Sequence, residues 1–228
     1  MCLADGERVV PLASAQDHKR VGDGDRGPNT GGMGAFSPVP AVDAAAGERI
    51  CEAVVAPTLH ELRRRGIDYR GVLYAGLMMT PDGPAVLEYN VRFGDPEAQV
   101  VLPLLDGDVA ALLAEAAAGA LRTAPAFRPE AAVTVVCASE GYPAAPRTGD
   151  VIEGLDAAGA IPGVTVYCAG VAAGPNGRLR TAGGRVLAVT GTARTLAGAR
   201  RQAYAGVAEL SWPGLHHRTD IASGSADR

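Results

Sequence analysis

The chain of 228 residues is poor in aromatic side chains, which make up only 4% of it. A hydrophobic core must therefore be built mainly from Ala, Val and Leu, which the 47% hydrophobic content allows. No run of about 18 apolar residues is present, so no membrane-spanning helix is predicted. No basic region followed by an apolar one opens the chain, so no signal peptide is predicted either.

An excess of positive charge is also absent, since the formal net charge is -4 and no long basic run occurs. A nucleic-acid-binding function therefore has no electrostatic support. The four cysteines, at positions 2, 51, 137 and 168, form no Cys-x-x-Cys pair, which argues against a zinc ribbon or a redox motif. Cys51 and Cys137 stand among apolar neighbours and are predicted to be small core residues. This cysteine usage is typical of a reducing cytoplasm.

The first part of the chain combines a glycine-rich segment with helix and strand signals. Residues 21–40 are rich in turn formers and predict a long loop. Apolar spacing predicts a helix over 42–65 that Pro57 kinks or splits. Two apolar stretches, 71–80 and 85–93, flank a turn and predict an antiparallel hairpin. The expected helix caps are Gly66, Asp95 (before Pro96) and Asp108, the last for a helix that ends near Gly119.

The second part of the chain changes character after a proline-containing linker over 122–130. Short β-rich stretches predict a small α+β domain of mostly antiparallel sheet, closed by one amphipathic helix. Its strands are expected near 133–136, 164–167, 178–181 and 185–190, with a turn at 174–177 and a helix over 195–210. We place one domain over 1–124 and a second over 130–222. The last residues, 222–228, are predicted to be frayed.

The predicted strand over 85–93 carries an unusual polar face. Alternation along a strand puts Glu88, Asn90 and Arg92 on one side. A carboxylate and an amide oxygen suit Mg²⁺, and a guanidinium can clamp a carboxylate or a phosphate. The alternation alone leaves two interpretations open: a metal site, or a solvated face with a Glu–Arg pair. An expected helix N-terminus after Asp95 favours the first.

Two polar segments precede this strand. Ser14 to Arg20 contains Asp17, His18 and Lys19, and residues 27–34 read Gly-Pro-Asn-Thr-Gly-Gly-Met-Gly. Successive glycine amides can form an anion-binding nest, although this is not the Walker A pattern and a glycine loop on its own is more often a plain turn. His18 is either a structural histidine or a catalyst. No nucleophile with a neighbouring base can be assigned.

Together these segments resemble the phosphoribosylamine–glycine ligases (glycinamide ribonucleotide synthetases). The resemblance rests on Ser14-Ala15-Gln16-Asp17-His18-Lys19-Arg20, on residues 27–34, and on Glu88-x-Asn90-x-Arg92-Phe93-Gly94-Asp95-Pro96-Glu97. Gly141-Tyr142-Pro143, residues 147–152 and Gly183-Gly184-Arg185-Val186 are similar to the C-terminal domain of that family. The matched segments run in order over nearly the whole chain.

The resemblance implies the C-terminal part of an ATP-grasp domain followed by the family's C-terminal domain. It implies ligation of glycine to 5-phosphoribosylamine in purine biosynthesis, with ATP as co-substrate and Mg²⁺ or Mn²⁺ as the metal. Glu88 and Asn90 would then be metal ligands, and Arg92 and Asp17 catalytic or substrate-holding residues. Asn29, Thr30, Gly31 and Gly32 would contact substrate or phosphate.

The resemblance also implies that a part of the enzyme is missing. This chain matches only the C-terminal part of the family, and the lysines and glycine-rich segment that cover the nucleotide belong to the rest. We therefore expect the chain to be inactive alone, as a fragment or as one half of a split enzyme with a separate N-terminal half. An ATP-grasp ligase for another carboxylate is the alternative. An exposed apolar patch around residues 1–12 would favour the split enzyme.

Overall fold

The computed structural model describes residues 1–226, so the part of the predicted frayed end at 227–228 lies outside the described residues. The chain divides into two compact units. Unit 1 comprises 1–14, 38–94 and 105–128, and unit 2 comprises 15–37, 95–104 and 129–228. The domain limits 1–124 and 130–222 stay a prediction. No helix in the described part is long and apolar enough to cross a membrane.

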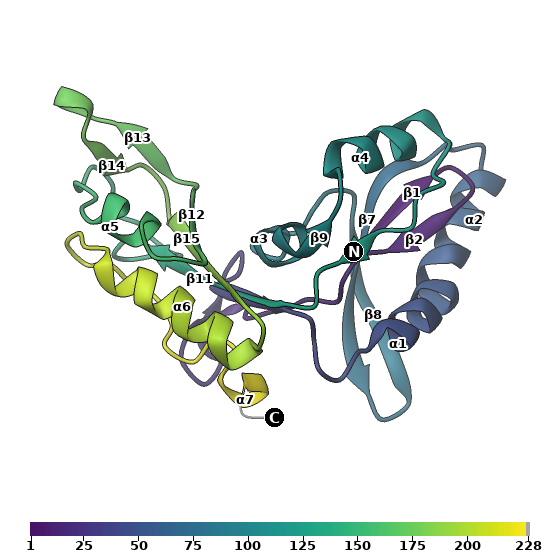
Figure 1. Cartoon of the computed structure of the whole chain (residues 1–228), viewed down its shortest axis with the longest axis horizontal. Helices are drawn as coiled ribbons and strands as arrows, with labels where there is room; N and C mark the ends of the chain where they lie inside the picture. Colours follow the sequence, from purple (N-terminus) through teal and green to yellow (C-terminus); the bar gives the residue numbers. More distant parts are fainter. Residues whose placement is uncertain (227–228) are drawn as a thin grey trace. The chain divides into compact units, whose positions relative to one another are not determined.

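Unit 1 contains a four-stranded antiparallel sheet in the order β2-β1-β7-β8. Its strands are β1 (Cys2–Asp5), β2 (Val9–Pro11), β7 (Arg70–Thr80) and β8 (Gly83–Asn90). The predicted hairpin is therefore confirmed, with its turn at Pro81 and Asp82. In Figure 1 the short β1 lies beside the part of β7 that is far from the closed end of this hairpin.

The helical run of unit 1 packs on this sheet. It consists of α1 (Ala44–Ile50), a π-helical segment (Cys51–Val55) and α2 (Ala56–Arg64). The predicted helix is therefore divided by the π-helical segment, and Pro57 lies in the first turn of α2. The core cluster combines buried Cys2, Cys51, Val55 and Leu73. On the sheet, α4 (Val109–Ala118) contacts β1 and β7, and β9 (Leu105–Asp106) pairs with β10 (Ala126–Phe127).

Local cap signals account for two helix ends of unit 1. After α2, Gly66 has φ +77°, and the amides of Gly66 and Ile67 donate to the carbonyls of Arg63 and Leu62. This double bond pattern is a Schellman motif, and it confirms the predicted cap. At α4 the Asp108 carboxylate accepts from the amide of Ala111 at 3.0 Å, also as predicted.

The prediction for the segment after β8 is wrong in two respects. The strand ends at Asn90 rather than at Phe93, because the chain bends at Val91 and Arg92. Asp95 is not a helix cap either, since it lies in a turn with Pro96. Helix α3 spans only Ala98–Val101, with Glu97 at its N-cap and no side-chain cap bond. The argument from a helix N-terminus at Asp95 therefore fails.

Unit 2 is built on a five-stranded antiparallel sheet in the order β12-β15-β11-β6-β3. The strands are β3 (Gln16–Asp17), β6 (Gly34–Ser37), β11 (Ala131–Ala138), β12 (Val164–Cys168) and β15 (Arg185–Ala193). A hairpin of β13 (Val171–Ala173) and β14 (Leu179–Thr181) closes through the predicted turn, and β11, β12, β14 and β15 confirm the four predicted strands. Cys137 is fully buried in β11, as predicted.

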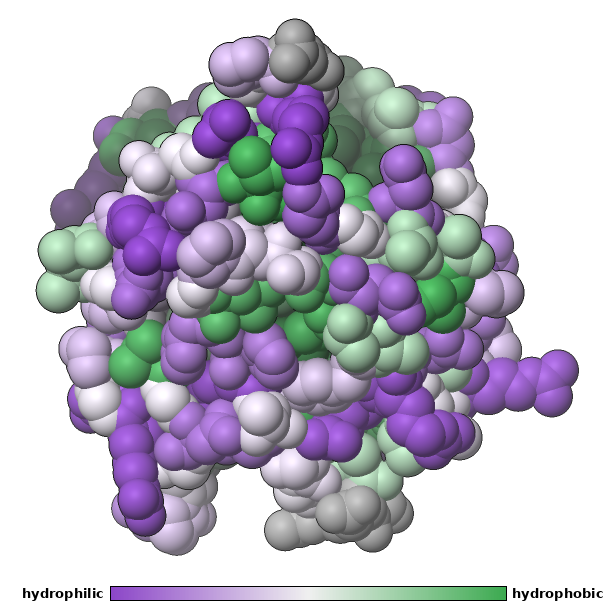
Figure 2. Space-filling model, turned by 90° about the vertical axis from the view of Figure 1, so that its left-hand side faces the viewer, coloured by the Kyte–Doolittle hydropathy of each residue, from purple (hydrophilic) through white to green (hydrophobic). Residues whose placement is uncertain are grey.

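Helices cover both faces of this sheet. On one face, α6 (Leu196–Glu209) packs on β15 and β11, and a Cβ at Gly206 would lie 2.7 Å from Val189. On the other face, Thr190 donates to the carbonyl of Gln99 in α3. Figure 1 shows α6 running along β11 and β15, with α5 (Leu155–Gly159) beside it and α7 (Ser223–Ala226) beyond. Figure 2 shows a face of this unit on which hydrophobic residues are scattered among hydrophilic ones.

The prediction of a long loop over 21–40 is wrong. This segment holds a small hairpin of β4 (Arg20–Gly22) and β5 (Arg26–Asn29), followed by β6, which is buried between β3 and β11. Gly24 and Gly32 have positive φ and lie between these strands, and Gly27, within β5, also has a positive φ. The turn-forming residues therefore separate three short strands. Strand β6 pairs with β11, which comes from a distant part of the chain.

Candidate functional site

The candidate metal ligands lie near the end of β8 in unit 1. Glu88 pairs with Gly76 and Asn90 pairs with Tyr74, so the two side chains share one face of the hairpin. The register shifts between Gly76 and Leu77, which places a bulge at Leu87 just before them. The Asn90 amide nitrogen donates to the Glu88 carboxylate at 3.2 Å. Both side chains are accessible, and the structure thus brings this predicted pair together.

Arg92 does not complete the predicted row. It follows the end of β8, is exposed, and donates from Nη1 to the carbonyl of Phe93 at 2.7 Å. Because strand alternation does not extend to it, its place beside Glu88 and Asn90 is not established by the pleat. Its predicted role as a substrate clamp stays a prediction.

Asp17 lies in unit 2, on the short edge strand β3, where it pairs with Ala35. Its carboxylate forms an ion pair with Lys19 at 3.0 Å, and its side chain is only 18% exposed. Asp17 and the glycine segment belong to one compact unit, whereas Glu88, Asn90 and Arg92 belong to the other.

His18 follows directly and is held by backbone bonds rather than by its ring. Its amide donates to the carbonyl of Gly34, and its own carbonyl accepts from the amide of Met33. The ring packs at 6.0 Å from that of Phe36. Burial, and then the positive charge of Arg218, lower the pKa of His18 below its usual value. Its Nδ1 is buried without a hydrogen-bond partner among the described residues.

The glycine segment is held mainly by bonds within unit 2. Thr30 donates from its amide and its hydroxyl to the carbonyl of Lys19, both at 2.8 Å, and Thr30 Oγ1 accepts from the amide of Gly32. The amide of Gly31 donates to the hydroxyl of Tyr142 at 3.1 Å. The amides of Gly31 and Gly32 are thus engaged, so a nest for phosphate would require these bonds to exchange. Asn29, at the end of β5, is exposed.

Arg185 connects the glycine segment to the turn after the candidate strand. Its Nη1 donates to the carbonyls of Gly31 at 3.0 Å and Asp95 at 2.8 Å, and its Nη2 lies 3.2 Å from the Asp95 carboxylate. A Cβ at Gly31 would lie 2.9 Å from the guanidinium carbon, so a side chain at position 31 would displace it. Sequence reasoning noted Arg185 only within a resembling run, because its partners lie far away in the chain.

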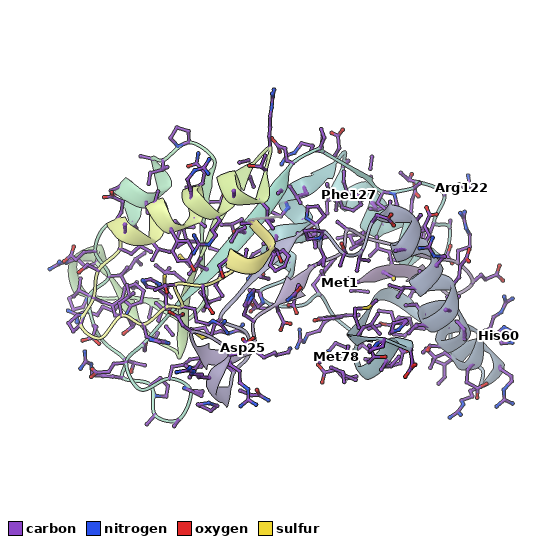
Figure 3. All side chains as sticks on the ribbon, turned by 90° about the horizontal axis from the view of Figure 1, so that it is seen from below. Met1, Asp25, His60, Met78, Arg122 and Phe127 are labelled. Carbon is purple, nitrogen blue, oxygen red and sulfur yellow. The ribbon has the colours of Figure 1, made fainter. Side chains whose placement is uncertain are left out.

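Arg218 fixes the small hairpin of β4 and β5. It is fully buried and donates to the carboxylates of Asp25 and Asp220, each at 2.7 Å, and to the carbonyl of Arg20 at 3.2 Å. The Arg218 guanidinium holds the pKa of Asp220 far below its usual range. Figure 3 labels Asp25 at the turn of this hairpin. Sequence reasoning missed Arg218, since an isolated Arg-Thr-Asp triplet gives no signal of burial.

Comparison with known proteins agrees with this arrangement of segments. A model of the phosphoribosylglycinamide synthetase ATP-grasp (A) domain matches residues 1–98, and a model of the phosphoribosylglycinamide synthetase C domain matches residues 132–224. The C-terminal portion of an ATP-grasp domain, followed by a mostly antiparallel α+β domain, is therefore the fold of this chain, as the sequence predicted.

Three relatives show how much of the family is present. A phosphoribosylamine–glycine ligase of Streptomyces coelicolor is 51% identical over 98% of this chain and 55% of its own length. For that of Vigna unguiculata the identity is 45%, over 93% of this chain and 70% of the relative. The crystal structure of phosphoribosylamine–glycine ligase from Thermotoga maritima superposes with a TM-score of 0.84 at 39% identity, covering 97% of this chain and 54% of that one.

The chain thus spans about half the length of several relatives that it matches, the Streptomyces protein among them. It carries both family domains in the order in which the sequence motifs appear. Because the Vigna protein is matched over more than two thirds of its length at high identity, the assignment does not rest on one domain alone. The chain belongs to the phosphoribosylamine–glycine ligase family.

Proposed function

We propose that this chain provides the metal- and substrate-binding half of an enzyme that ligates glycine to 5-phosphoribosylamine in de novo purine biosynthesis. In this reaction the glycine carboxylate attacks the γ-phosphorus of ATP and releases ADP. The amine of phosphoribosylamine then attacks the acyl phosphate, loses a proton and releases phosphate, giving glycinamide ribonucleotide. The observation that carries the proposal is the pair Glu88 and Asn90, set side by side on a strand of a chain with both family domains.

The donor set of this pair fits Mg²⁺ or Mn²⁺ bound together with ATP. The described residues contain no group of three or more acidic, histidine or cysteine side chains that could hold a metal ion by themselves. Mg²⁺ is commonly bound by one or two protein oxygens plus substrate phosphates, and Glu88 and Asn90 offer one carboxylate and one amide oxygen. The metal, when bound, would neutralise charge on the transferred phosphoryl group.

The other predicted site residues take supporting roles in the proposal. Arg92 is exposed, always charged and able to bind a carboxylate or phosphate in a bidentate manner. Asp17 would hold an amino group of glycine or of the ribosyl substrate. Asn29, Thr30, Gly31 and Gly32 would contact substrate or phosphate, with Thr30 already ordered by two bonds to Lys19. Arg92 and Asp17 are the proposed catalytic residues.

The proposed enzyme is incomplete in this chain alone. We propose modules at 1–124 and 130–222, acting with a separate N-terminal half that supplies the remaining nucleotide-binding residues. This half is favoured by relatives about twice as long as the matched region. We also propose a cytoplasmic location, as expected for soluble purine-biosynthesis enzymes. An inactive fragment, or a ligase for another carboxylate, is the alternative function.

The test is an assay of ADP release that depends on glycine and phosphoribosylamine. The purified chain is assayed alone and mixed with the unmatched part of the Streptomyces coelicolor relative, produced as a separate polypeptide. We expect turnover only in the mixture and only with both substrates. Robust turnover by the chain alone would overturn the split arrangement. Turnover with another carboxylate but not with glycine would establish the alternative ligase, and no turnover in any mixture would leave the inactive fragment.

A further inference from the structure

The first strand of unit 1 is buried rather than exposed. Cys2–Ala4 and Leu12 have little accessible surface, so the exposed apolar patch expected around residues 1–12 is not there. Strand β1 lies inside the four-stranded sheet, between β2 and β7. Its first residue, Cys2, belongs to the core cluster that also contains Cys51 of the helical run. The core of this unit therefore contains two cysteines from distant parts of the chain.

The side chains of Cys2 and Cys51 are in direct contact. Their sulfur atoms lie 3.7 Å apart, although the residues are separated by 49 positions in the sequence. Each residue is only 5% exposed, and the buried neighbours Val55 and Leu73 are apolar. Both cysteines are free thiols in this structure. The contact thus places two groups that can be oxidised together against each other, in the place where β1 meets the π-helical segment.

The other two cysteines lie too far apart to form such a pair. Cys137 of β11 and Cys168 of β12 lie on opposite sides of β15, and each is paired with Leu187. Two strand spacings, about 9.6 Å, therefore separate their backbones. A disulfide requires Cα atoms within about 7 Å of each other. Within the two units, the cysteines of unit 1 are in contact and those of unit 2 are kept apart by a strand.

The helical run is fixed to the rest of unit 1 by few side chains. All seven residues of α1 are described, and none of them is buried. The π-helical segment buries Cys51 and Val55, and α2 buries Leu59. Segments with few buried apolar contacts open more readily than the core does. A covalent bond at Cys51 would therefore fix to β1 a helix that side-chain burial holds weakly.

The two sulfur atoms also differ in how readily they ionise. A hydrogen bond from Cys51 lowers the pKa of Cys2, and the same bond, followed by burial, raises the pKa of Cys51. The thiolate is the form of cysteine that reacts with oxidants, so Cys2 is the sulfur expected to react first. Burial raises the pKa of Cys137 to about 12, which keeps that thiol protonated and unreactive.

We propose that Cys2 and Cys51 form a reversible disulfide that fastens the helical run to β1 when a peroxide is present. The sulfur atoms must approach by about 1.7 Å, from their contact at 3.7 Å to a covalent bond of about 2.05 Å. The segment that moves buries two side chains, so its shift disturbs little packing. In a reducing cytoplasm the pair exists as thiols, and disulfides there are usually transient and sense oxidants.

The reaction uses two thiols and one molecule of hydrogen peroxide. The Cys2 thiolate attacks one peroxide oxygen, the O–O bond breaks, and hydroxide leaves, which gives a sulfenic acid on Cys2. The Cys51 sulfur then attacks the Cys2 sulfur, the S–O bond breaks, and the departing hydroxide takes the Cys51 proton. The two thiols lose two electrons and the peroxide becomes two molecules of water. A small dithiol reverses the bond by thiol–disulfide exchange. Disulfide formation requires no substrate and no second polypeptide.

The experiment counts thiols and locates the bond in the whole chain. Cys168→Ser removes the exposed thiol and is the starting protein, with three of the four cysteines left. It is reduced, freed of reductant, treated with hydrogen peroxide while folded, and then denatured for thiol counting. We expect the count to fall from three to one, with the peptides of Cys2 and Cys51 joined in a map made without reductant. Dithiothreitol should restore all three thiols.

The bond should also change stability, because it closes a loop of 49 positions. Urea denaturation of the oxidised protein should show a midpoint at least about 0.5 M higher than that of the reduced protein. The control is Cys51→Ala in the same background, in which peroxide should not raise the midpoint. Its Cys2 should stop at the sulfenic acid, which dimedone traps. Cys2→Ala serves as the control if Cys51→Ala does not fold.

Three results would overturn the proposal. The first is a count of three thiols after peroxide treatment of the folded starting protein. The second is a bond that involves Cys137 or joins two copies of the chain. The third is an oxidised protein whose midpoint is equal to or below that of the reduced protein, since the bond would then not fasten the helical run. Cys137→Ala should still form the bond between Cys2 and Cys51, and failure to do so would count against the pair as well.

Discussion

The two units differ in how firmly hydrogen bonds and ion pairs hold their candidate site residues. In unit 2, Arg185 donates to the glycine segment and Arg218 donates to the β4–β5 hairpin. The Arg218 side chain is completely buried. In unit 1 the Glu88–Asn90 pair stands on an accessible strand end with one mutual bond, beside half-exposed Met78 and Leu87. The difference shows that unit 2 holds the glycine segment with its own side chains, whereas the Glu88–Asn90 pair of unit 1 is accessible and has one mutual bond.

This contrast predicts different consequences of mutation. Changes at the unit 1 candidates should affect turnover of the completed enzyme and leave folding intact. Changes at the unit 2 arginines should affect folding first, because these side chains hold segments together.

The largest expected effect is on turnover, for Glu88→Gln. Loss of the only carboxylate of the pair should lower ADP release by the mixture of the two halves at least about a hundredfold, since one stabiliser of developing charge contributes about 3 kcal/mol. The urea midpoint should not change, because Glu88 is exposed. Glu52→Gln, at another exposed carboxylate of unit 1, is the control and should retain turnover. A shifted urea midpoint in Glu88→Gln would contradict the division of roles.

The next effect is on stability, for Arg218→Met. Removing a buried cation that pairs with Asp25 and Asp220 should lower the free energy of unfolding by about 3 kcal/mol, the lower end for a broken buried pair because both carboxylates reach solvent. Urea denaturation followed by circular dichroism measures it. Arg201→Met, on the exposed side of α6, should shift the curve little. Equal shifts for the two variants would show that Arg218 does not fix the hairpin.

A smaller effect is expected for Arg185→Met. The glycine segment would lose a charged donor to two carbonyls and to Asp95, which should cost about 1–2 kcal/mol. Faster amide hydrogen exchange at Gly31 and Gly32 should accompany it. Arg185→Lys should not restore protection, because an ammonium does not reproduce the fork of the guanidinium. Unchanged exchange in both variants would remove Arg185 from this role.

A local rule is tested at Gly66, whose φ of +77° ends α2. Gly66→Ala should destabilise unit 1 by about 1 kcal/mol, because the left-handed conformation is unfavourable for a side chain. A Cβ would meet no atom within 4 Å at Gly66 or at Gly47. Gly47→Ala, inside α1, should instead stabilise by about 0.5–1 kcal/mol. Thermal melts of the two variants should therefore move in opposite directions.

The smallest effect concerns pH. The pKa of His18 is lowered in the fold, so below pH 6.5 the unfolded chain binds a proton that the folded chain does not. Stability of unit 2 should therefore be full above pH 6.5 and fall as the pH decreases toward the folded pKa of His18. His18→Gln should flatten this part of the Tm profile, while His60→Gln, at an exposed position in unit 1, should not. A steeper profile in His18→Gln would reverse the assignment.

Much of the local structure was predictable from the sequence. The hairpin of 70–90, the cap at Asp108 and the Schellman end at Gly66 follow from turn residues and apolar patterns within a few positions of each other. The family motifs also pointed to Glu88 and Asn90 as neighbours. Alternation failed at Arg92 because the strand ends at Asn90, and the cap prediction failed at Asp95 because the chain turns there before α3 begins.

By itself the sequence determined the longest helices, several turns and the family, since these depend on residues close together in the chain or on matched motifs. Only the tertiary structure decided that β6 enters a sheet with β11, about a hundred positions later, and thereby turned an expected loop into a buried strand. The partners of Arg218, up to 198 positions away, belong to the same class. They arise from long-range pairing, in which burial and hydrogen bonding are decided by segments that no local pattern brings together.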